Sequence, residues 1–242
     1  EDLDLHLEVI LAQSRAALRR DNFSGAEQRL REAYDNSESA HQKARLHLEL
    51  ARLLGGMHRF EDALELAQNA RFEFERLSEM PDAYEATLVE AGLLMARPDA
   101  WAAHRVLTKT VIDPATQPGT EARRLELLAQ TTNIIGEPDQ AGRWAKKSIQ
   151  LALSIGDKQT ALRAKLTLIK TQSQRNEDGR AIHRALNALL EHQRNIQDLE
   201  GLARTYYFLA EEAVRGHLPG VTRTAASEMI HQSTRLFRKV GL

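Results

Sequence analysis

The residues best suited to chemistry in this sequence are arginines that return at one position of a repeating pattern. The pattern has a period of about 40 residues, and four of its six copies carry the arginine. A guanidinium group offers a planar fork of donors that binds a carboxylate or a phosphate through two parallel hydrogen bonds. A row of such groups would suit an acidic partner. The members of the row are Arg45, Arg123, Arg163 and Arg204.

Residue patterns typical of catalysis or metal binding are missing from the sequence. The nine histidines are scattered, and none forms a His-x-x-x-His pair with two ligands on one helical face. There is no Gly-x-x-x-x-Gly-Lys phosphate loop and no Gly-x-Ser-x-Gly nucleophile elbow. The lack of cysteine excludes a thiolate zinc site and a cysteine nucleophile. We therefore predict no catalytic residue, no metal site, no cofactor and no enzymatic activity.

The charge balance argues against a nucleic acid or a membrane as the partner. The 242 residues contain 33 Lys+Arg and 34 Asp+Glu, so the formal net charge of −1 creates no global field toward either. No apolar run approaches the roughly 20 residues that span a bilayer, and no signal peptide opens the chain. We expect a cytoplasmic protein. Because the chain starts on Glu1, we also expect it to be a fragment of a longer one.

Small residues recur with helical spacing along the whole chain. The clearest copy is Ala63, Ala67 and Ala70, at positions i, i+4 and i+7, which lie on one face of a helix. Small side chains on such a stripe let two helices approach closely. In the third copy, Ala102 or Ala103 fills the first position. The other copies are Ala26, Leu30 and Ala33; Ala141, Ala145 and Ser148; Ala181, Ala185 and Ala188; and Ala226, Ile230 and Ser233.

A second apolar segment precedes each stripe, usually by twelve residues, and the intervening residues include Gly, Pro, Asn or Asp. These residues stop helices and reverse the chain, so each copy predicts a helix, a short turn and a second helix. Asp82, Asp157 and Asp198 precede apolar runs as helix N-caps would. The reference positions of the first segments are Ser14, Ala51, Gly92, Ala129, Ile169 and Ala210.

This alternation resembles the tetratricopeptide repeat (TPR). The residues that carry the resemblance are Leu50, Ala51, Leu54, Ala63, Ala67 and Ala70. It implies an all-α superhelix of about six helical hairpins in a single domain, residues 1–242. The expected units are about 3–38, 39–79, 82–113, 120–156, 157–197 and 198–241. The period exceeds the 34 residues of the standard repeat, as in the sensor segments of bacterial signalling and transcription regulators.

The resemblance also implies where a ligand would bind. First helices line the concave side of such a superhelix, and the positions six before and one after Ala51 would face it. The first position carries the arginine row, and the second carries Arg15, Arg52, Lys170 and Glu211, with Gln130 in the fourth unit. Tyr207 would point into the groove, while Tyr206 and Phe208 pack. The binding candidates are Arg45, Arg52, Arg123, Arg163, Lys170, Arg204 and Tyr207.

We therefore expect a non-catalytic module that binds a peptide, a protein segment or a small ligand, as part of a larger bacterial regulatory protein. A chaperone adaptor does not fit, because Leu48 and Arg52 occupy positions of the family's carboxylate clamp. The alternative is a scaffold or homodimerisation module, joined through apolar residues of the last helix. These residues are Met229, Ile230, Leu236 and Phe237.

The two tryptophans, Trp101 and Trp144, are expected to fill seams between helices.

Overall fold

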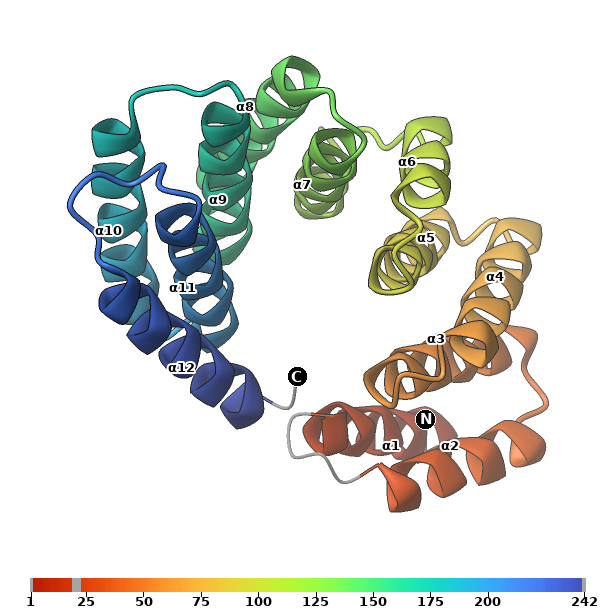
Figure 1. The fold of residues 1–242 in the computed structure, drawn as a ribbon. Helices are drawn as coiled ribbons and strands as arrows, with labels where there is room; N and C mark the ends of the chain where they lie inside the picture. The colour runs from red at the N-terminus through yellow and green to blue at the C-terminus, as the bar shows by residue number, and fades with distance from the viewer. Residues whose placement is uncertain (1, 19–22, 241–242) are drawn as a thin grey trace. The chain divides into compact units, whose positions relative to one another are not determined.

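The computed structural model describes residues 2–18 and 23–240, and all regular structure in these ranges is α-helical (Figure 1). The prediction of an all-α repeat fold is confirmed. No helix in the described ranges is both long and apolar enough to cross a membrane. The helices are α1 (Asp2–Leu18), α2 (Ser24–Asn36), α3 (Ala40–Gly56), α4 (Phe60–Arg76), α5 (Met80–Ala96), α6 (Ala100–Lys109), α7 (Pro118–Ile134), α8 (Pro138–Ser154), α9 (Lys158–Gln174), α10 (Gly179–Asn195), α11 (Leu199–Val214) and α12 (Arg223–Val240).

The chain forms two compact units of three hairpins each. Residues 1–112 hold α1 to α6, and residues 113–240 hold α7 to α12. Consecutive helices pair as hairpins. In each unit the first helices of neighbouring hairpins are also in contact: α3 contacts α5, and α7 contacts α9. One apolar cluster of the second unit joins α9 to α12. The single domain over residues 1–242 stays a prediction.

In the second and fourth hairpins the alanine stripes lie at the seams between helices, as the sequence predicts, whereas on α12 the predicted stripe residue Ile230 is 43 % exposed. In the second hairpin Ala51, Ala63, Ala67 and Ala70 are fully buried. In the fourth, Ala129, Ala141 and Ala145 are equally closed to solvent. A methyl group at these points leaves room for larger neighbours such as Phe74, which is fully buried beside Ala70. Close approach of paired helices therefore follows directly from these small side chains.

The stripe predicted for α10 is wrong by one residue. Ala181 and Ala188 are exposed and Ala185 is half-buried, whereas Ile182, Leu186 and Leu189 are buried. The buried set has the same i, i+4, i+7 spacing one position later. Burial of the large apolar face stabilises the fold more than burial of alanine, so it decides which face turns inward. In the third hairpin, likewise, the buried reference residue is Ala91 rather than Gly92, and Ala103 rather than Ala102 fills the seam.

The turns confirm two of the three predicted N-caps. The Asp157 carboxylate accepts a hydrogen bond from the Thr160 amide, and the Asp198 carboxylate accepts one from the Gly201 amide. Asp157 follows Gly156, whose φ of +76° ends α8 in the left-handed region. The prediction for Asp82 is wrong, because Pro81 allows α5 to start at Met80 and so places Asp82 inside its first turn. The turn residues 19–22 lie outside the described part of the chain.

Two hairpins replace the last alanine of the stripe with serine and gain the same hydrogen bond. The Ser148 hydroxyl donates to the carbonyl oxygen of Ala122 at 2.8 Å, and the Ser233 hydroxyl donates to that of Ala203 at 2.8 Å. Both serines are buried. The paired carbonyls lie seven residues before Ala129 and Ala210, so the hairpins repeat an interaction as well as a shape.

The aromatic residues divide between core and surface. Phe74 is buried and Phe72 is exposed, as expected of packing and surface positions on α4. The prediction for Trp101 is wrong: it is 67 % exposed on α6, whose buried residues are Ala100, Ala103 and Leu107. Trp144 on α8 is half-buried, with the Lys147 ammonium 5.0 Å from its ring centroid.

Candidate binding surface

The first helices of the second unit bring together most of the predicted binding residues. We call this surface the basic face; its residues are Arg123, Glu126, Gln130, Arg163, Lys170, Glu200, Arg204, Tyr207, Phe208 and Glu211. They come from α7, α9 and α11, whose hairpins are stacked so that α9 contacts both other helices. The turns between hairpins fix the register of these three helices, so equivalent positions share one face.

Two arginines of the basic face share one carboxylate. Arg163 Nη2 lies 2.9 Å from Glu200 Oε2, and Arg204 Nη2 lies 2.8 Å from Glu200 Oε1. The Arg163 contact joins α9 to α11, whereas the Arg204 contact lies within α11. The Arg204 side chain remains 48 % exposed. One carboxylate cannot neutralise two guanidinium groups, so positive charge remains at this point of the surface.

Glu126 lies among these basic groups but is almost fully buried. Burial raises the pKa of Glu126, while a hydrogen bond from the Gln130 amide and the charges of Arg163 and Arg204 act in the opposite direction. The net effect is a raised pKa, because loss of hydration outweighs the favourable neighbours. The carboxylate of Glu200 adds to the same shift.

Lys170 shows the complementary effect. Burial lowers the pKa of Lys170, and the positive charge of Arg204 lowers it further, while Glu211 and Glu126 oppose the shift. Its ammonium group lies 5.3 Å from the ring centroid of Phe208, a cation–π contact across α9 and α11. The charged form of this lysine would be favoured by any anion placed beside it.

The aromatic triplet of α11 divides between the surface and the core. Tyr207 is 56 % exposed, Phe208 is buried, and Tyr206 is half-buried with its hydroxyl accepting a hydrogen bond from Arg194. Tyr207 therefore offers a ring to solvent on the helix that carries Arg204. Its contact with a ligand stays a prediction.

In the first unit the predicted binding arginines are engaged by carboxylates. Arg45 pairs with Glu8 at 2.5 Å, and Arg52 pairs with Glu49 at 3.1 Å and with Glu85 at 3.6 Å. Glu8 and Glu85 occupy the same repeat position as Arg45, so neighbouring hairpins neutralise one another here. Of the remaining candidates, Arg123 is half-buried on α7, and the side chain of Arg15 lies outside the described residues.

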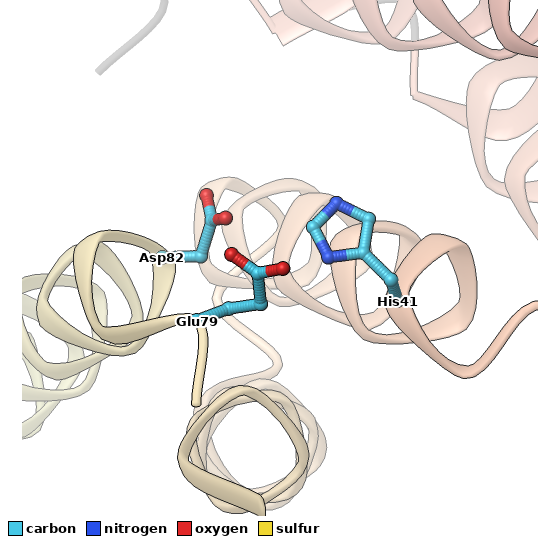
Figure 2. Close-up of side chains that lie close together, drawn as sticks. All are labelled: His41, Glu79 and Asp82. Atoms are coloured by element: carbon cyan, nitrogen blue, oxygen red, sulfur yellow. The ribbon is translucent and has the colours of Figure 1, made fainter. Parts of the chain in front are cut away.

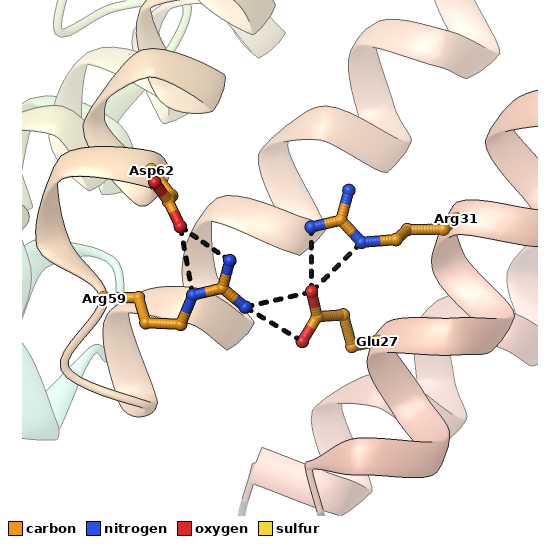
Figure 3. Close-up of polar contacts among 4 residues, drawn as sticks. All are labelled: Glu27, Arg31, Arg59 and Asp62. Atoms are coloured by element: carbon orange, nitrogen blue, oxygen red, sulfur yellow. Dashed lines mark hydrogen bonds and ion pairs between the residues drawn. The ribbon is translucent and has the colours of Figure 1, made fainter.

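A second group of charges in the first unit ties one hairpin to the next. Glu27 of α2 accepts hydrogen bonds from Arg31, at 2.8 Å, and from Arg59, at 3.1 Å (Figure 3). Arg59 precedes α4 and also donates to Asp62 at 2.6 Å. The hydrogen bond from Arg31, followed by the charge of Arg59, lowers the pKa of Glu27 against the opposing effect of burial. We call this network the Glu27 brace, because it links α2 to the residue before α4 and so connects two hairpins.

Sequence reasoning missed two acidic members of the basic face, Glu126 and Glu200, and one cluster elsewhere. Glu126 sits where Leu48 stands in the second hairpin, a buried position at which a carboxylate is a visible departure from the pattern. His41, Glu79 and Asp82 converge in the first unit although 38 residues separate the first two (Figure 2). Only the stacking of hairpins brings them together, so no local motif reveals them.

No protein-family model and no curated protein matches the chain. Solved structures do match it. A Rap conjugation gene regulator of the plasmid pLS20, in complex with the Phr* peptide, has a TM-score of 0.77 and 11 % identity over 99 % of this chain and 64 % of its own. The apo form of RapI has a TM-score of 0.72 and 12 % identity, over 97 % of this chain and 98 % of its own.

Eukaryotic repeat proteins match as well. The TPR-like repeats of a putative kinesin light chain from Podosopora anserina have a TM-score of 0.62 and 16 % identity, over 80 % of this chain and 97 % of their own. At identities this low, the structural similarity shows the fold alone. The chain has a TPR-like fold of stacked helical hairpins.

Proposed function

We propose that the protein is a non-catalytic binding module, and that the basic face takes an acidic peptide or protein segment. The module would serve as the sensor or interaction segment of a larger bacterial regulatory protein. The observation that carries this proposal is the pair of guanidinium groups on a single carboxylate, Arg163 and Arg204 on Glu200, beside an exposed Tyr207.

The charges of the basic face support an acidic ligand. The ionised form of Glu126 is disfavoured by burial, and so is the charged form of Lys170. A ligand carboxylate near Lys170 would favour its ammonium form and could form a bidentate pair with Arg204. Two of the structures similar to this chain are Rap proteins, one in complex with the Phr* peptide and one with the Competence and Sporulation Factor, which supports a peptide ligand.

A labelled acidic peptide tests the proposal. The probe is a fluorescein-labelled decaglutamate, titrated with the chain and followed by anisotropy. The variant Arg163→Gln/Arg204→Gln should bind at least tenfold more weakly than wild type, which is about 1.4 kcal/mol. Addition of Arg123→Gln should abolish binding while the helical circular dichroism stays unchanged.

The matched control removes the same charge from a different face. Arg235 and Arg238 are exposed on α12, so Arg235→Gln/Arg238→Gln changes the net charge equally and should leave binding within twofold. Equal weakening in both double variants would mean that the peptide senses net charge only. That result, or unchanged binding in the Arg163/Arg204 variant, would refute a site on the basic face.

Self-association through α12 is the second candidate function. Ile230 is 43 % exposed and Phe237 is half-buried on this helix, but Met229 and Leu236 pack against the core of the second unit. The expected dimer surface is therefore smaller than the sequence suggests. Light scattering of Ile230→Glu and wild type tests it, since a dimer held by this patch should dissociate in the variant.

A further inference from the structure

Three side chains of metal-ligand type converge in the first unit, whereas the basic face belongs to the second unit. His41 lies in the first turn of α3, and Glu79 and Asp82 lie at the start of α5. One ligand atom from each lies within 4.8 Å of the other two (Figure 2). The cluster therefore joins the first helices of two consecutive hairpins.

The imidazole of His41 has a buried nitrogen without a partner. Its Nδ1 is closed to solvent and has no hydrogen-bond partner, and the ring edge that carries it faces the Glu79 carboxylate (Figure 2). Phe74, which is fully buried, holds the ring from its side, with 5.8 Å between ring centroids and an interplanar angle of 67°. A buried polar atom without a partner requires an explanation, and an ion is a common one.

The Glu79 side chain gives a second indication. Glu79 occupies the N-cap position of α5, where Ser, Thr, Asp or Asn ordinarily accepts a hydrogen bond from the first helical amides. It makes no such bond and extends toward His41 instead (Figure 2). Asp82 in the first turn directs its carboxylate to the same space. Capping of the helix therefore does not explain the placement of Glu79.

We propose that His41, Glu79 and Asp82 bind a divalent first-row transition-metal ion, with Zn²⁺ the best match. One imidazole nitrogen and two carboxylate oxygens form a ligand set that Zn²⁺ accepts at about 2.0–2.2 Å, with a fourth position left for water. Ligand atoms around such an ion are about 3–4 Å apart, so the cluster needs only small side-chain rotations to close on it. Glu79 is exposed and Asp82 half-buried, which gives both carboxylates freedom to move and gives the ion an entry path.

The ion would act as a clamp between hairpins. His41 belongs to the second hairpin and the two carboxylates to the third, so coordination would add to the contacts between these hairpins, which include the apolar residues Ala44, Ala83 and Ala86 and the Arg71–Glu90 ion pair. Metal binding favours the folded chain, because the three ligands come together only when the hairpins stack.

Titration of the full chain with Co²⁺ and Zn²⁺ tests the site. Co²⁺ should give visible d–d absorption that Zn²⁺ abolishes at one equivalent, and Zn²⁺ should raise the melting temperature. His41→Gln, Glu79→Gln and Asp82→Asn should each weaken Zn²⁺ binding at least tenfold. The matched control is His231→Gln, an exposed histidine on α12, which should leave the affinity within twofold.

Circular dichroism of each variant establishes that it is folded, and the Co²⁺ spectrum of the wild type gives a readout that needs no variant. Equal Zn²⁺ affinity in His41→Gln and wild type would mean scattered surface binding only and would overturn the site. A Co²⁺ titration without visible bands would overturn it as well. Neither result depends on the acidic-peptide experiment, which concerns a different unit.

Discussion

Charged side chains do two different things in this protein, and burial separates the two. Around Glu27 they are partly exposed and satisfy one another, which braces neighbouring hairpins. On the basic face, Glu126 and Lys170 are held where their charged forms are disfavoured. The first arrangement serves stability, and the second leaves interactions that a ligand could improve.

The brace around Glu27 predicts a stability that depends on pH. Its lowered pKa means that the ionised form stabilises the folded chain above the ordinary glutamate pKa, and that this contribution is lost as the pH falls through the lowered value. Glu27→Gln should therefore lower the free energy of unfolding by about 0.5–1 kcal/mol at pH 7, since the pairs are partly exposed. Urea unfolding at pH 7 and in acid measures the difference, which should shrink with acidification. Glu65→Gln, at an exposed position on α4, is the control and should change little.

Glu126 predicts a pH dependence of stability that has the opposite sign to that of Glu27. Because its pKa is raised, the folded chain keeps the proton at pH values where the unfolded chain has lost it, so stability falls as the pH rises through this range. Glu126→Gln should stabilise the chain at neutral pH and have no such effect in acid, below the ordinary glutamate pKa. Glu200→Gln removes the shared partner of two arginines and should destabilise it. Thermal melts of both variants at two pH values give the comparison, and a neutral-pH loss of stability in Glu126→Gln would contradict the assignment.

The helices and their pairing could be predicted from the sequence, but the buried face of each helix could not always be. Helix boundaries follow from Gly156, Asp157 and Asp198, whose effects are local. The buried face of α10 does not follow from spacing alone, because two adjacent stripes have the same period and only side-chain volume distinguishes them. The positions of the binding candidates follow from the repeat, whereas the pairing of Arg45 with Glu8 depends on two hairpins being stacked.

The register of α10 can be tested with two substitutions. Leu186 is fully buried, so Leu186→Ala should cost about 2–5 kcal/mol through lost burial and the cavity left behind. Ala188→Leu adds three carbons at an exposed position and should change the free energy of unfolding by less than about 0.5 kcal/mol. If Ala188 instead lined the seam, overpacking would make its substitution the costly one. Chemical denaturation of both variants settles the order.

Each compact unit contains three hairpins and an apolar core of its own. In the first, Leu30 and Leu46 lie in a cluster over α1 to α3; in the second, Leu186 and Leu209 lie in one over α9 to α12. Three stacked repeats are about the minimum that buries a continuous core. The division at residue 112 therefore yields pieces large enough to be considered folding units.

Separate expression tests this expectation. A fragment of residues 113–242 should fold with the helix content that the same residues have in the full chain and should unfold cooperatively. Circular dichroism and urea titration measure both properties. Residues 1–112 provide the parallel experiment, and a fragment of residues 113–242 that is unfolded at low temperature would show that its hairpins need the rest of the chain.

The unequal exposure of the two indoles has a spectroscopic consequence. Trp101, in the first unit, is largely hydrated already, so its emission maximum should move little on denaturation. Trp144, in the second, lies partly shielded under the Lys147 ammonium and should shift to the red and change in intensity. The change in intrinsic fluorescence on unfolding should therefore come mainly from the second unit, and its midpoint will differ from that of the far-ultraviolet signal whenever the two units melt separately.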